Sequence, residues 1–151
     1  VFIWGNSGNG KSSAVASLCK EIAKFGKVLY VSLEEGTSLS FQNTISRFGL
    51  DECGARFQVL ESASVDDLDE RLSRPKSPEF IVIDSFQYLQ ISYKRYIAFK
   101  EAHRNKLLIF VSHSKGRFIG RTGEAVIWQK GADEYWGINE INNNTKAYEE
   151  E

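Results

Sequence analysis

The sequence predicts an α/β domain in which helices flank a mostly parallel sheet. Short apolar runs alternate along the chain with stretches whose apolar residues recur at helical spacing. This alternation is typical of parallel strands that are joined by helices. The runs over 28–33 and 80–83 are apolar almost without interruption, which indicates strands buried on both faces. A length of 151 residues, of which 42% are hydrophobic, suits one domain with a core of its own.

The first predicted elements are a strand over 1–4 and a helix over 11–25, with a glycine-rich turn between them. Apolar residues at three- and four-residue spacing predict the helix, and Gly26 is a natural stop after it. Ser64 and the acidic residues that follow it resemble a capping box at the start of a later helix. The remaining predicted strands cover 28–33, 57–60, 80–83, 107–111 and 136–141, and the remaining predicted helices cover 38–48, 64–74 and 93–103.

Composition and charge exclude several classes of protein. No apolar run approaches the roughly 18 residues of a membrane span, and no signal peptide or lipidation motif opens the chain. The net charge of −1 gives no overall attraction to nucleic acid, so such binding would need a local basic patch. Two cysteines are too few for a disulfide framework and suit a reducing compartment. We therefore expect a cytoplasmic protein that does not enter a membrane.

The chain contains no methionine and begins at Val1, inside a predicted strand. A chain of this length ordinarily carries several methionines. We therefore expect residues 1–151 to form a single core that is truncated before Val1. After His113 the chain is expected either to be abbreviated or to lack a segment. Because such a segment would lengthen the chain, we treat the numbers of residues between motifs as lower bounds.

The strongest motif runs from Gly5 to Ser12 and matches the Walker A pattern G-x-x-x-x-G-K-S/T. It stands between a predicted strand and a predicted helix, as this motif requires. Its glycines let successive backbone N–H groups point at phosphate oxygens, and the helix adds the positive end of its dipole. Lys11 supplies a charge to the β- and γ-phosphates, and Ser12 offers a hydroxyl to Mg²⁺. The expected nucleotide-binding residues are Gly5, Asn6, Ser7, Gly8, Asn9, Gly10, Lys11, Ser12 and Ser13.

Three further candidates follow predicted strands directly. Asp84 ends the apolar run over 80–83, where an acidic group can hold the hydration shell of Mg²⁺, and its neighbour Ser85 is expected to cap a turn or to support the site indirectly. Glu34 and Glu35 follow the run over 28–33. Because ligands of open parallel sheets bind at the carboxyl ends of the strands, one of these two is expected to orient the attacking water. Glu34 is favoured because it is closer to the strand.

The two histidines are interpreted differently. His113 ends the run over 107–111 and could sense the γ-phosphate, although a buried histidine of purely structural role is the alternative. His103 lies at the polar end of a predicted helix and is expected to be exposed.

The stretch after His113 is rich in glycine and carries Lys115, Arg117 and Arg121 around Phe118. These basic residues could contact a nucleic-acid backbone, with the aromatic ring stacking on a base. One arginine could instead reach the nucleotide of a neighbouring subunit as an arginine finger, and a solvated surface loop is the third interpretation. Further on, Trp128, Tyr135 and Trp136 are expected to be core or interface anchors.

The joint order of these motifs resembles the RecA-like ATPases, which include recombinases, RadA and KaiC proteins, and the hexameric helicases of DnaB and RepA type. The resemblance is carried by the Walker A motif and by the segments 30–35, 81–85 and 111–113. It implies that Glu34 activates water and that His113 is a sensor. The segments 114–120, 127–128 and 135–137 are more loosely similar to RecA-like ATPases of bacterial prophages and mobile elements.

This resemblance implies Mg²⁺-dependent binding and hydrolysis of ATP by Lys11, Glu34 and His113, with the metal on Ser12 and Asp84. It further implies that hydrolysis is coupled to DNA handling in recombination, replication or a helicase-type motor, with single-stranded DNA as a partner and a ring or filament of identical subunits. Two alternatives remain open, because fold does not fix function. One is a kinase that phosphorylates a small molecule or nucleotide, and the other is an assembly module that is switched by nucleotide and turns it over slowly.

Overall fold

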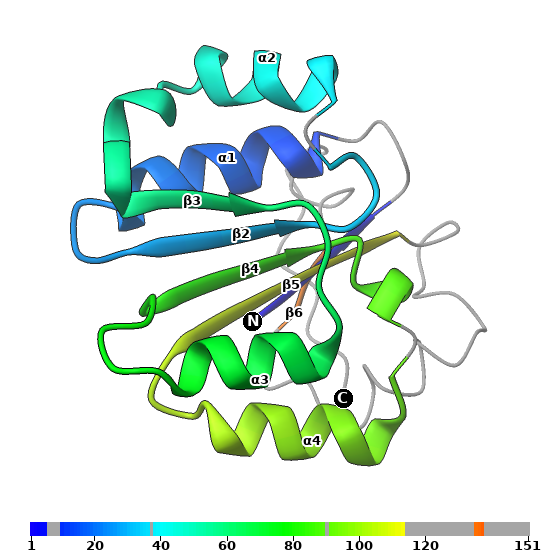
Figure 1. Cartoon of the computed structure of the whole chain (residues 1–151). Helices are drawn as coiled ribbons and strands as arrows, with labels where there is room; N and C mark the ends of the chain where they lie inside the picture. Colours follow the sequence, from blue (N-terminus) through cyan, green and yellow to red (C-terminus); the bar gives the residue numbers. More distant parts are fainter. Residues whose placement is uncertain (6–9, 37, 90, 114–134, 138–151) are drawn as a thin grey trace.

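The computed structural model describes residues 1–5, 10–36, 38–89, 91–113 and 135–137 (Figure 1). Strands and helices alternate along most of this part of the chain, as the sequence predicts. In chain order the elements are β1 (Phe2–Gly5), α1 (Lys11–Ile22), β2 (Val28–Ser32), α2 (Leu39–Arg47), η1 (Asp51–Arg56), β3 (Phe57–Leu60), α3 (Val65–Ser73), β4 (Phe80–Asp84), η2 (Phe86–Leu89), α4 (Tyr93–Ala102), β5 (Leu107–His113) and β6 (Tyr135–Gly137).

The strands form one six-stranded sheet in the order β3-β2-β4-β5-β1-β6. Every pair of neighbouring strands is parallel, so the prediction of a mostly parallel sheet is confirmed. All carboxyl ends of the strands therefore lie at the same edge, which is where open parallel sheets bind their ligands.

Helices cover both faces of the sheet, which makes a three-layer fold. Figure 1 shows α1 and α2 on one face and α3 and α4 on the other. Residues of β2 alternate between the two interfaces: Val28 and Tyr30 pack with α1 and α2, whereas Leu29 and Val31 pack with α3 and α4. All five residues of β2 are buried, as expected for a strand covered on both faces.

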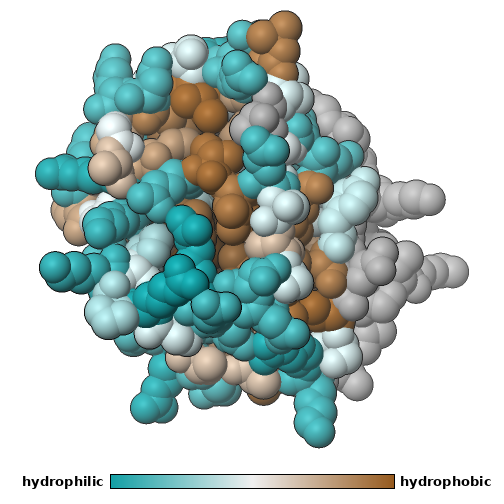
Figure 2. All heavy atoms as spheres, viewed as in Figure 1, coloured by the Kyte–Doolittle hydropathy of each residue, from teal (hydrophilic) through white to brown (hydrophobic). Residues whose placement is uncertain are grey.

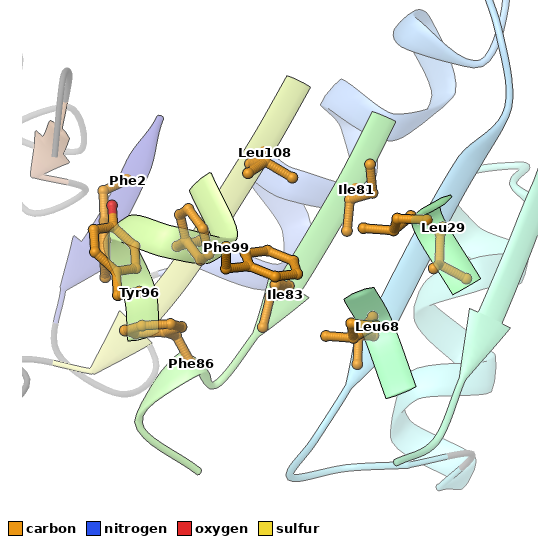
Figure 3. Close-up of a cluster of buried hydrophobic side chains, with 12 residues drawn as sticks. Phe2, Leu29, Leu68, Ile81, Ile83, Phe86, Tyr96, Phe99 and Leu108 are labelled. Carbon is orange, nitrogen blue, oxygen red and sulfur yellow. The ribbon is translucent and has the colours of Figure 1, made fainter. Parts of the chain in front are cut away.

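The interface under α3 and α4 is rich in aromatic side chains. Figure 3 shows Phe86 of η2 and Tyr96 of α4 lying beside Phe2 of β1. Together with Phe110 of β5, these rings form pairs whose centroids are 5.0 to 5.8 Å apart, the range in which aromatic rings attract one another. The packing of Phe86 explains why the chain turns into η2, an element that the sequence did not predict.

Three of the four α-helices that the structure describes begin at a serine whose hydroxyl accepts a backbone N–H of the first turn. These serines are Ser38, Ser64 and Ser92. At Ser64 the side chain of Asp67 accepts a hydrogen bond in return from the backbone N–H of the serine, so the predicted capping box is confirmed. Such a cap satisfies donors that the helix itself leaves unpaired. The exception is α1.

Several element boundaries differ from those predicted. The helix predicted over 11–25 ends at Ile22, because residues 23–25 form a turn in which the backbone N–H groups of Lys24 and Phe25 bond to carbonyls three residues back. Strand β5 continues to His113 because its last four residues, from Phe110 to His113, pair with β1. The late strand predicted over 136–141 is Tyr135–Gly137, and the short helix η1 has no counterpart among the predictions.

Apolar surface gathers in a band across the face that Figure 1 presents, over the region of β3 (Figure 2). All four residues of β3 are partly buried. Among the described strands β3 pairs only with β2, so it forms one edge of the sheet.

No helix in the described part of the chain is long and apolar enough to cross a bilayer.

Candidate functional site

Four of the six strands bring predicted site residues to one edge of the sheet. Gly5 at the end of β1 is opposite His113 at the end of β5, and Ser32 at the end of β2 is opposite Asp84 at the end of β4. Glu34 follows β2 by two residues, and α1 starts shortly after β1. The carboxyl edge thus holds the start of α1 and the carboxylates that the sequence singled out.

Lys11 is the first residue of α1 and is buried, with 6% of its surface exposed. Burial lowers the pKa of its ammonium group, whereas the nearby charges of Asp84 and Glu34 act to raise the pKa. The three predicted residues are therefore close enough to interact electrostatically. Ser12 is exposed and Ser13 is partly exposed at the same end of the helix.

The start of α1 differs from the starts of the other helices. Gly10 precedes it with φ of 78°, and none of the described side chains caps it. A Cβ atom at Gly10 would meet no atom of the described residues within 4 Å, so among these residues the backbone conformation rather than lack of space favours glycine there. First-turn N–H groups without a side-chain cap, next to a buried lysine, form an environment suited to an anion.

Asp84 is held from the neighbouring strand. The hydroxyl of Tyr30 in β2 donates a hydrogen bond of 2.5 Å to Oδ2 of Asp84. Tyr30 is 1% exposed, and burial, with a further contribution from the charge of Asp84, raises the pKa of the phenol well above its usual value. The phenol therefore stays protonated and remains a donor to the carboxylate.

Glu34 receives a hydrogen bond from the residue after Asp84. The hydroxyl of Ser85 donates to Oε2 of Glu34 over 2.8 Å. Ser85 is 5% exposed and has a positive φ of 60°, which is uncommon for a residue other than glycine. The interpretation of Ser85 as a supporting group fits this contact.

Glu35 lies beside the same carboxylates. Burial, followed by the charges of Asp84 and Glu34, raises the pKa of its carboxyl group. Both glutamates therefore lie within electrostatic reach of the other charged groups of the site. The contact with Ser85 distinguishes Glu34, because it fixes that carboxylate against β4.

The prediction that His103 is exposed is wrong. Its side chain is only 3% exposed, and its Nε2 lies 2.6 Å from Oδ1 of Asp69 in α3. The ring also packs edge to face on Phe99, with centroids 4.9 Å apart. His103 directly follows the last residue of α4 and contacts Asp69 of α3, so it is covered although Glu101 and Ala102 before it are exposed.

Some predicted residues lie outside the described part of the chain. Asn6, Ser7, Gly8 and Asn9 of the Walker A motif do so, as do Lys115, Arg117, Arg121 and Trp128. His113, Tyr135 and Trp136 are placed as strand residues, without a description of their side chains. Their roles stay predictions.

Sequence reasoning did not assign a role at this edge to Tyr30, Ser32 or Ser112. All three are buried, at 1%, 1% and 2% exposure. One signal was present: each is a polar residue inside an otherwise apolar strand segment, and buried polar groups need partners.

Two hollows of the surface lie at the opposite, amino-terminal edge of the sheet. They have volumes of about 410 and 450 Å³, and both are lined by His103 and Lys106. None of the candidate residues at the carboxyl edge lines either hollow. They are therefore separate from the candidate site.

No protein-family model and no curated protein matches the chain. Among solved structures, the flagellar accessory protein FlaH from Methanocaldococcus jannaschii is similar with a TM-score of 0.68 and 17% sequence identity, over 90% of this chain and 69% of FlaH. A second solved structure, described as an ATPase domain, is similar with a TM-score of 0.63 and 13% identity, over 90% of this chain and 67% of that chain. At these identities the likeness establishes the architecture. The chain therefore has the RecA-like α/β fold that the order of its motifs implied.

Proposed function

We propose that the chain binds ATP with Mg²⁺ at the carboxyl edge of the sheet and hydrolyses it. The observation that carries this proposal is the convergence of three groups at the start of α1. The ammonium of Lys11 is buried there, and the carboxylates of Asp84 and Glu34 lie within electrostatic reach of it. A buried cation facing two carboxylates suits a polyanion that arrives with its own metal ion.

The phosphate chain would lie against the first turn of α1. Its N–H groups have no cap among the described side chains, and the glycine before them adopts a left-handed conformation. Lys11 would neutralise the β- and γ-phosphates, which also offsets the cost of burying its charge. The Walker A spacing of residues 5–12 supports this placement.

Ser12 and Asp84 would hold Mg²⁺. No group of three or more His, Cys, Asp or Glu side chains arranged to hold a metal occurs among the described residues. Mg²⁺ commonly binds through one or two carboxylates together with substrate phosphates, so the small donor set fits this ion. Held by these two residues, Mg²⁺ would supply positive charge that offsets the negative charge of the phosphates.

Glu34 would orient the attacking water and accept its proton. It lies next to the metal-holding Asp84 and is fixed by the Ser85 hydroxyl, as a positioned base must be. His113 would sense the γ-phosphate from the end of β5, the strand between β1 and β4 in the sheet.

The output that we propose is DNA handling, with single-stranded DNA as a partner and a ring or filament of identical subunits. The RecA-like fold and the likeness to the second solved structure, the ATPase domain, support a motor. Lys115, Arg117 and Arg121 would contact the DNA backbone or a neighbouring nucleotide.

The likeness to FlaH favours a second candidate function. FlaH is a flagellar accessory protein, which fits a module whose assembly is switched by nucleotide with little turnover. In that case ATP would change the mass of the particle in the absence of DNA.

Hydrolysis of ATP by the full chain, with and without single-stranded DNA, tests the proposal. We expect Mg²⁺-dependent hydrolysis that DNA stimulates, and loss of nucleotide binding in Lys11→Ala. Lys24→Ala is the matched control, because Lys24 is exposed and pairs with Glu21 away from the site. Binding by Lys11→Ala at the level of wild type would contradict the proposed site. Nucleotide-dependent assembly without turnover would favour the second candidate, and phosphoryl transfer to an acceptor would favour a kinase.

A further inference from the structure

The two carboxylates of the site are held by a reciprocal pair of hydrogen bonds between β2 and β4. Tyr30 of β2 donates to Asp84 at the end of β4, over 2.5 Å. Ser85, which follows β4, donates to Glu34, which follows β2, over 2.8 Å. A hydroxyl from β2 thus reaches the carboxylate at the end of β4, and a hydroxyl just after β4 reaches a carboxylate just after β2. The strands are direct neighbours, with Ser32 opposite Asp84.

The phenol of Tyr30 is rigidly placed. Its side chain is 1% exposed, and its ring packs against Phe41 and Phe57, with centroids 5.0 and 6.2 Å away. Val28 and Tyr30 face the same side of the strand, and both pack with residues of α1. Tyr30 therefore lies on the side of the sheet covered by the helix that begins with Lys11.

Ser85 is placed by an unusual backbone conformation. Its φ of 60° lies in the left-handed region, which costs free energy for a residue with a Cβ atom. It is also 5% exposed, so its hydroxyl needs a partner inside the protein. The turn after β4 gives it one, the carboxylate of Glu34.

We propose that Tyr30 and Ser85 are positioning residues, Tyr30 for the metal-holding carboxylate of Asp84 and Ser85 for the water-orienting carboxylate of Glu34. The inference rests on the proposed function and deepens it. A hydrogen bond to one carboxylate oxygen fixes the orientation of the group, and partners of this kind typically change metal affinity or activity by about 10- to 100-fold when removed. The two bonds act on different steps, because Asp84 serves the metal and Glu34 serves the water.

The first test is Tyr30→Phe, which removes one hydroxyl and keeps the ring. Binding of a fluorescent ATP analogue is titrated with Mg²⁺. We expect the half-saturating Mg²⁺ concentration to rise about tenfold, with binding retained at saturating Mg²⁺. The control is Tyr96→Phe, because Tyr96 is equally buried, at 1% exposure, but lies in the cluster on the other face of the sheet. An unchanged Mg²⁺ requirement in Tyr30→Phe, or an equal rise in the control, overturns the assignment of Tyr30.

The second test compares Ser85→Ala with Ser85→Gly. Both lack the hydroxyl, but glycine adopts a positive φ without strain, so an effect common to both belongs to the hydroxyl. We expect unchanged affinity for the Mg²⁺-bound analogue and turnover that is about tenfold lower. Ser77→Ala is the control, since the Ser77 hydroxyl donates to the backbone carbonyl of Leu72. Turnover at the wild-type level in both Ser85 variants overturns the assignment of Ser85.

Unfolding measurements provide a readout that is independent of turnover. Single and double variants of Tyr30→Phe with Asp84→Asn, and of Ser85→Ala with Glu34→Gln, form two cycles. We expect non-additive changes in the denaturation midpoint in both cycles, because each pair shares one hydrogen bond. Additive changes overturn the corresponding bond.

The wild-type chain separates the two levels of inference. If it fails to bind the analogue, the proposed function is wrong and this inference falls with it. If it binds with Mg²⁺ while the variants match it, only this inference is wrong. If it binds but does not turn over ATP, the role of Ser85 is overturned, and the Mg²⁺ titration still decides the role of Tyr30.

Discussion

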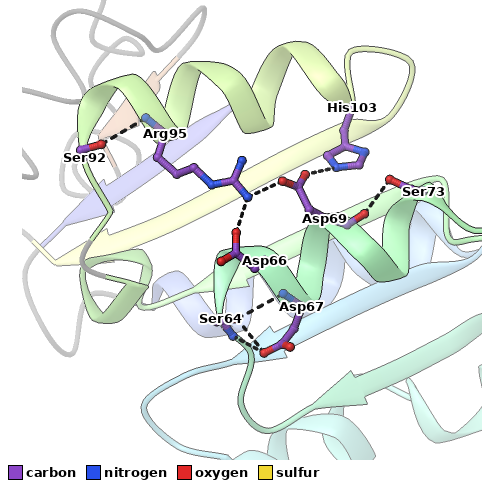
Figure 4. A network of polar contacts seen from close by, with 8 residues as sticks. All are labelled: Ser64, Asp66, Asp67, Asp69, Ser73, Ser92, Arg95 and His103. Atoms are coloured by element: carbon purple, nitrogen blue, oxygen red, sulfur yellow. Dashed lines mark hydrogen bonds and ion pairs between the residues drawn. The ribbon is translucent and has the colours of Figure 1, made fainter.

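Nε2 of His103 lies 2.6 Å from Oδ1 of Asp69, and this contact joins the end of α4 to the middle of α3 (Figure 4). The other oxygen of Asp69 contacts Arg95, which also reaches Asp66 over 2.6 Å. One carboxylate of α3 therefore holds two side chains from α4 and its end. Because His103 is almost fully buried, this network fixes how the two helices lie on the sheet.

Asp69→Ala is predicted to lower the free energy of unfolding by about 1–3 kcal/mol, since it leaves the buried ring nitrogen of His103 without this partner. Urea denaturation measures the change. The matched variant is Asp66→Ala, whose carboxylate is 85% exposed and contacts the same arginine. Exposed ion pairs contribute less than about 1 kcal/mol, so the loss should be clearly smaller. Equal losses would mean that the contact with His103 does not stabilise the fold.

Gly10→Ala is predicted to destabilise the protein by about 1–2 kcal/mol, because an alanine is strained in the left-handed region. The φ of Gly10 is 78°, and no atom in the described part of the chain lies within 4 Å of where a Cβ atom would be. The cost should therefore come from the backbone and not from a clash. Gly10→Asn tests this distinction, since asparagine tolerates the left-handed region better than alanine. Thermal unfolding should rank wild type above Asn and Asn above Ala, and the reverse order of the two variants would contradict the conformational explanation.

Local patterns in the sequence predicted most of the fold. The largely apolar run of β2 predicted a strand covered on both faces, and Ser64 with the acidic residues that follow it predicted a capping box at the start of α3. The Walker A spacing predicted the junction of β1 and α1. Each of these signals lies within about ten residues, so no knowledge of tertiary contacts was needed.

The interactions that organise the site could not be predicted in this way. Tyr30 and Asp84 are 54 positions apart, and Ser85 and Glu34 are 51 positions apart. Their pairing depends on β2 and β4 being neighbours in register, which no local pattern specifies. The same reason explains the error at His103, because its partner Asp69 is 34 positions away on another helix.

Lys11→Met is predicted to stabilise the protein without nucleotide at neutral pH. Burial lowers the pKa of Lys11 in the folded state, so between that pKa and the usual lysine pKa the unfolded chain binds more protons. The stability of wild type therefore rises with pH through this window. At pH values below this window, Lys11→Met should exceed wild type in stability by its full margin. The margin should disappear as the pH rises toward about 10.4, the usual pKa of lysine.

Thermal unfolding at a series of pH values measures this difference, with Lys20→Met as the control of opposite sign. The hydrogen bond to Glu52 raises the pKa of Lys20, so the loss of its charge should lower stability at neutral pH. That loss should vanish only as the pH rises through the raised pKa of Lys20. A Lys11 variant that is less stable than wild type at neutral pH would contradict the cost of burying this charge.

Glu34→Gln and Glu35→Gln are predicted to differ in turnover, because only Glu34 is fixed by the hydroxyl of Ser85. Loss of a positioned base typically slows a reaction by about 10²- to 10⁴-fold, so we expect a fall of this order in Glu34→Gln with nucleotide binding retained. Glu35→Gln should keep most of the wild-type turnover.

Glu35→Gln should also be more stable than wild type at neutral pH, because burial and the charges of Asp84 and Glu34 raise the pKa of the Glu35 carboxyl. That gain should shrink as acid protonates Glu35 in wild type. Single-turnover hydrolysis together with equilibrium binding separates the two glutamates, and a larger loss of turnover in Glu35→Gln would transfer the water-orienting role to Glu35.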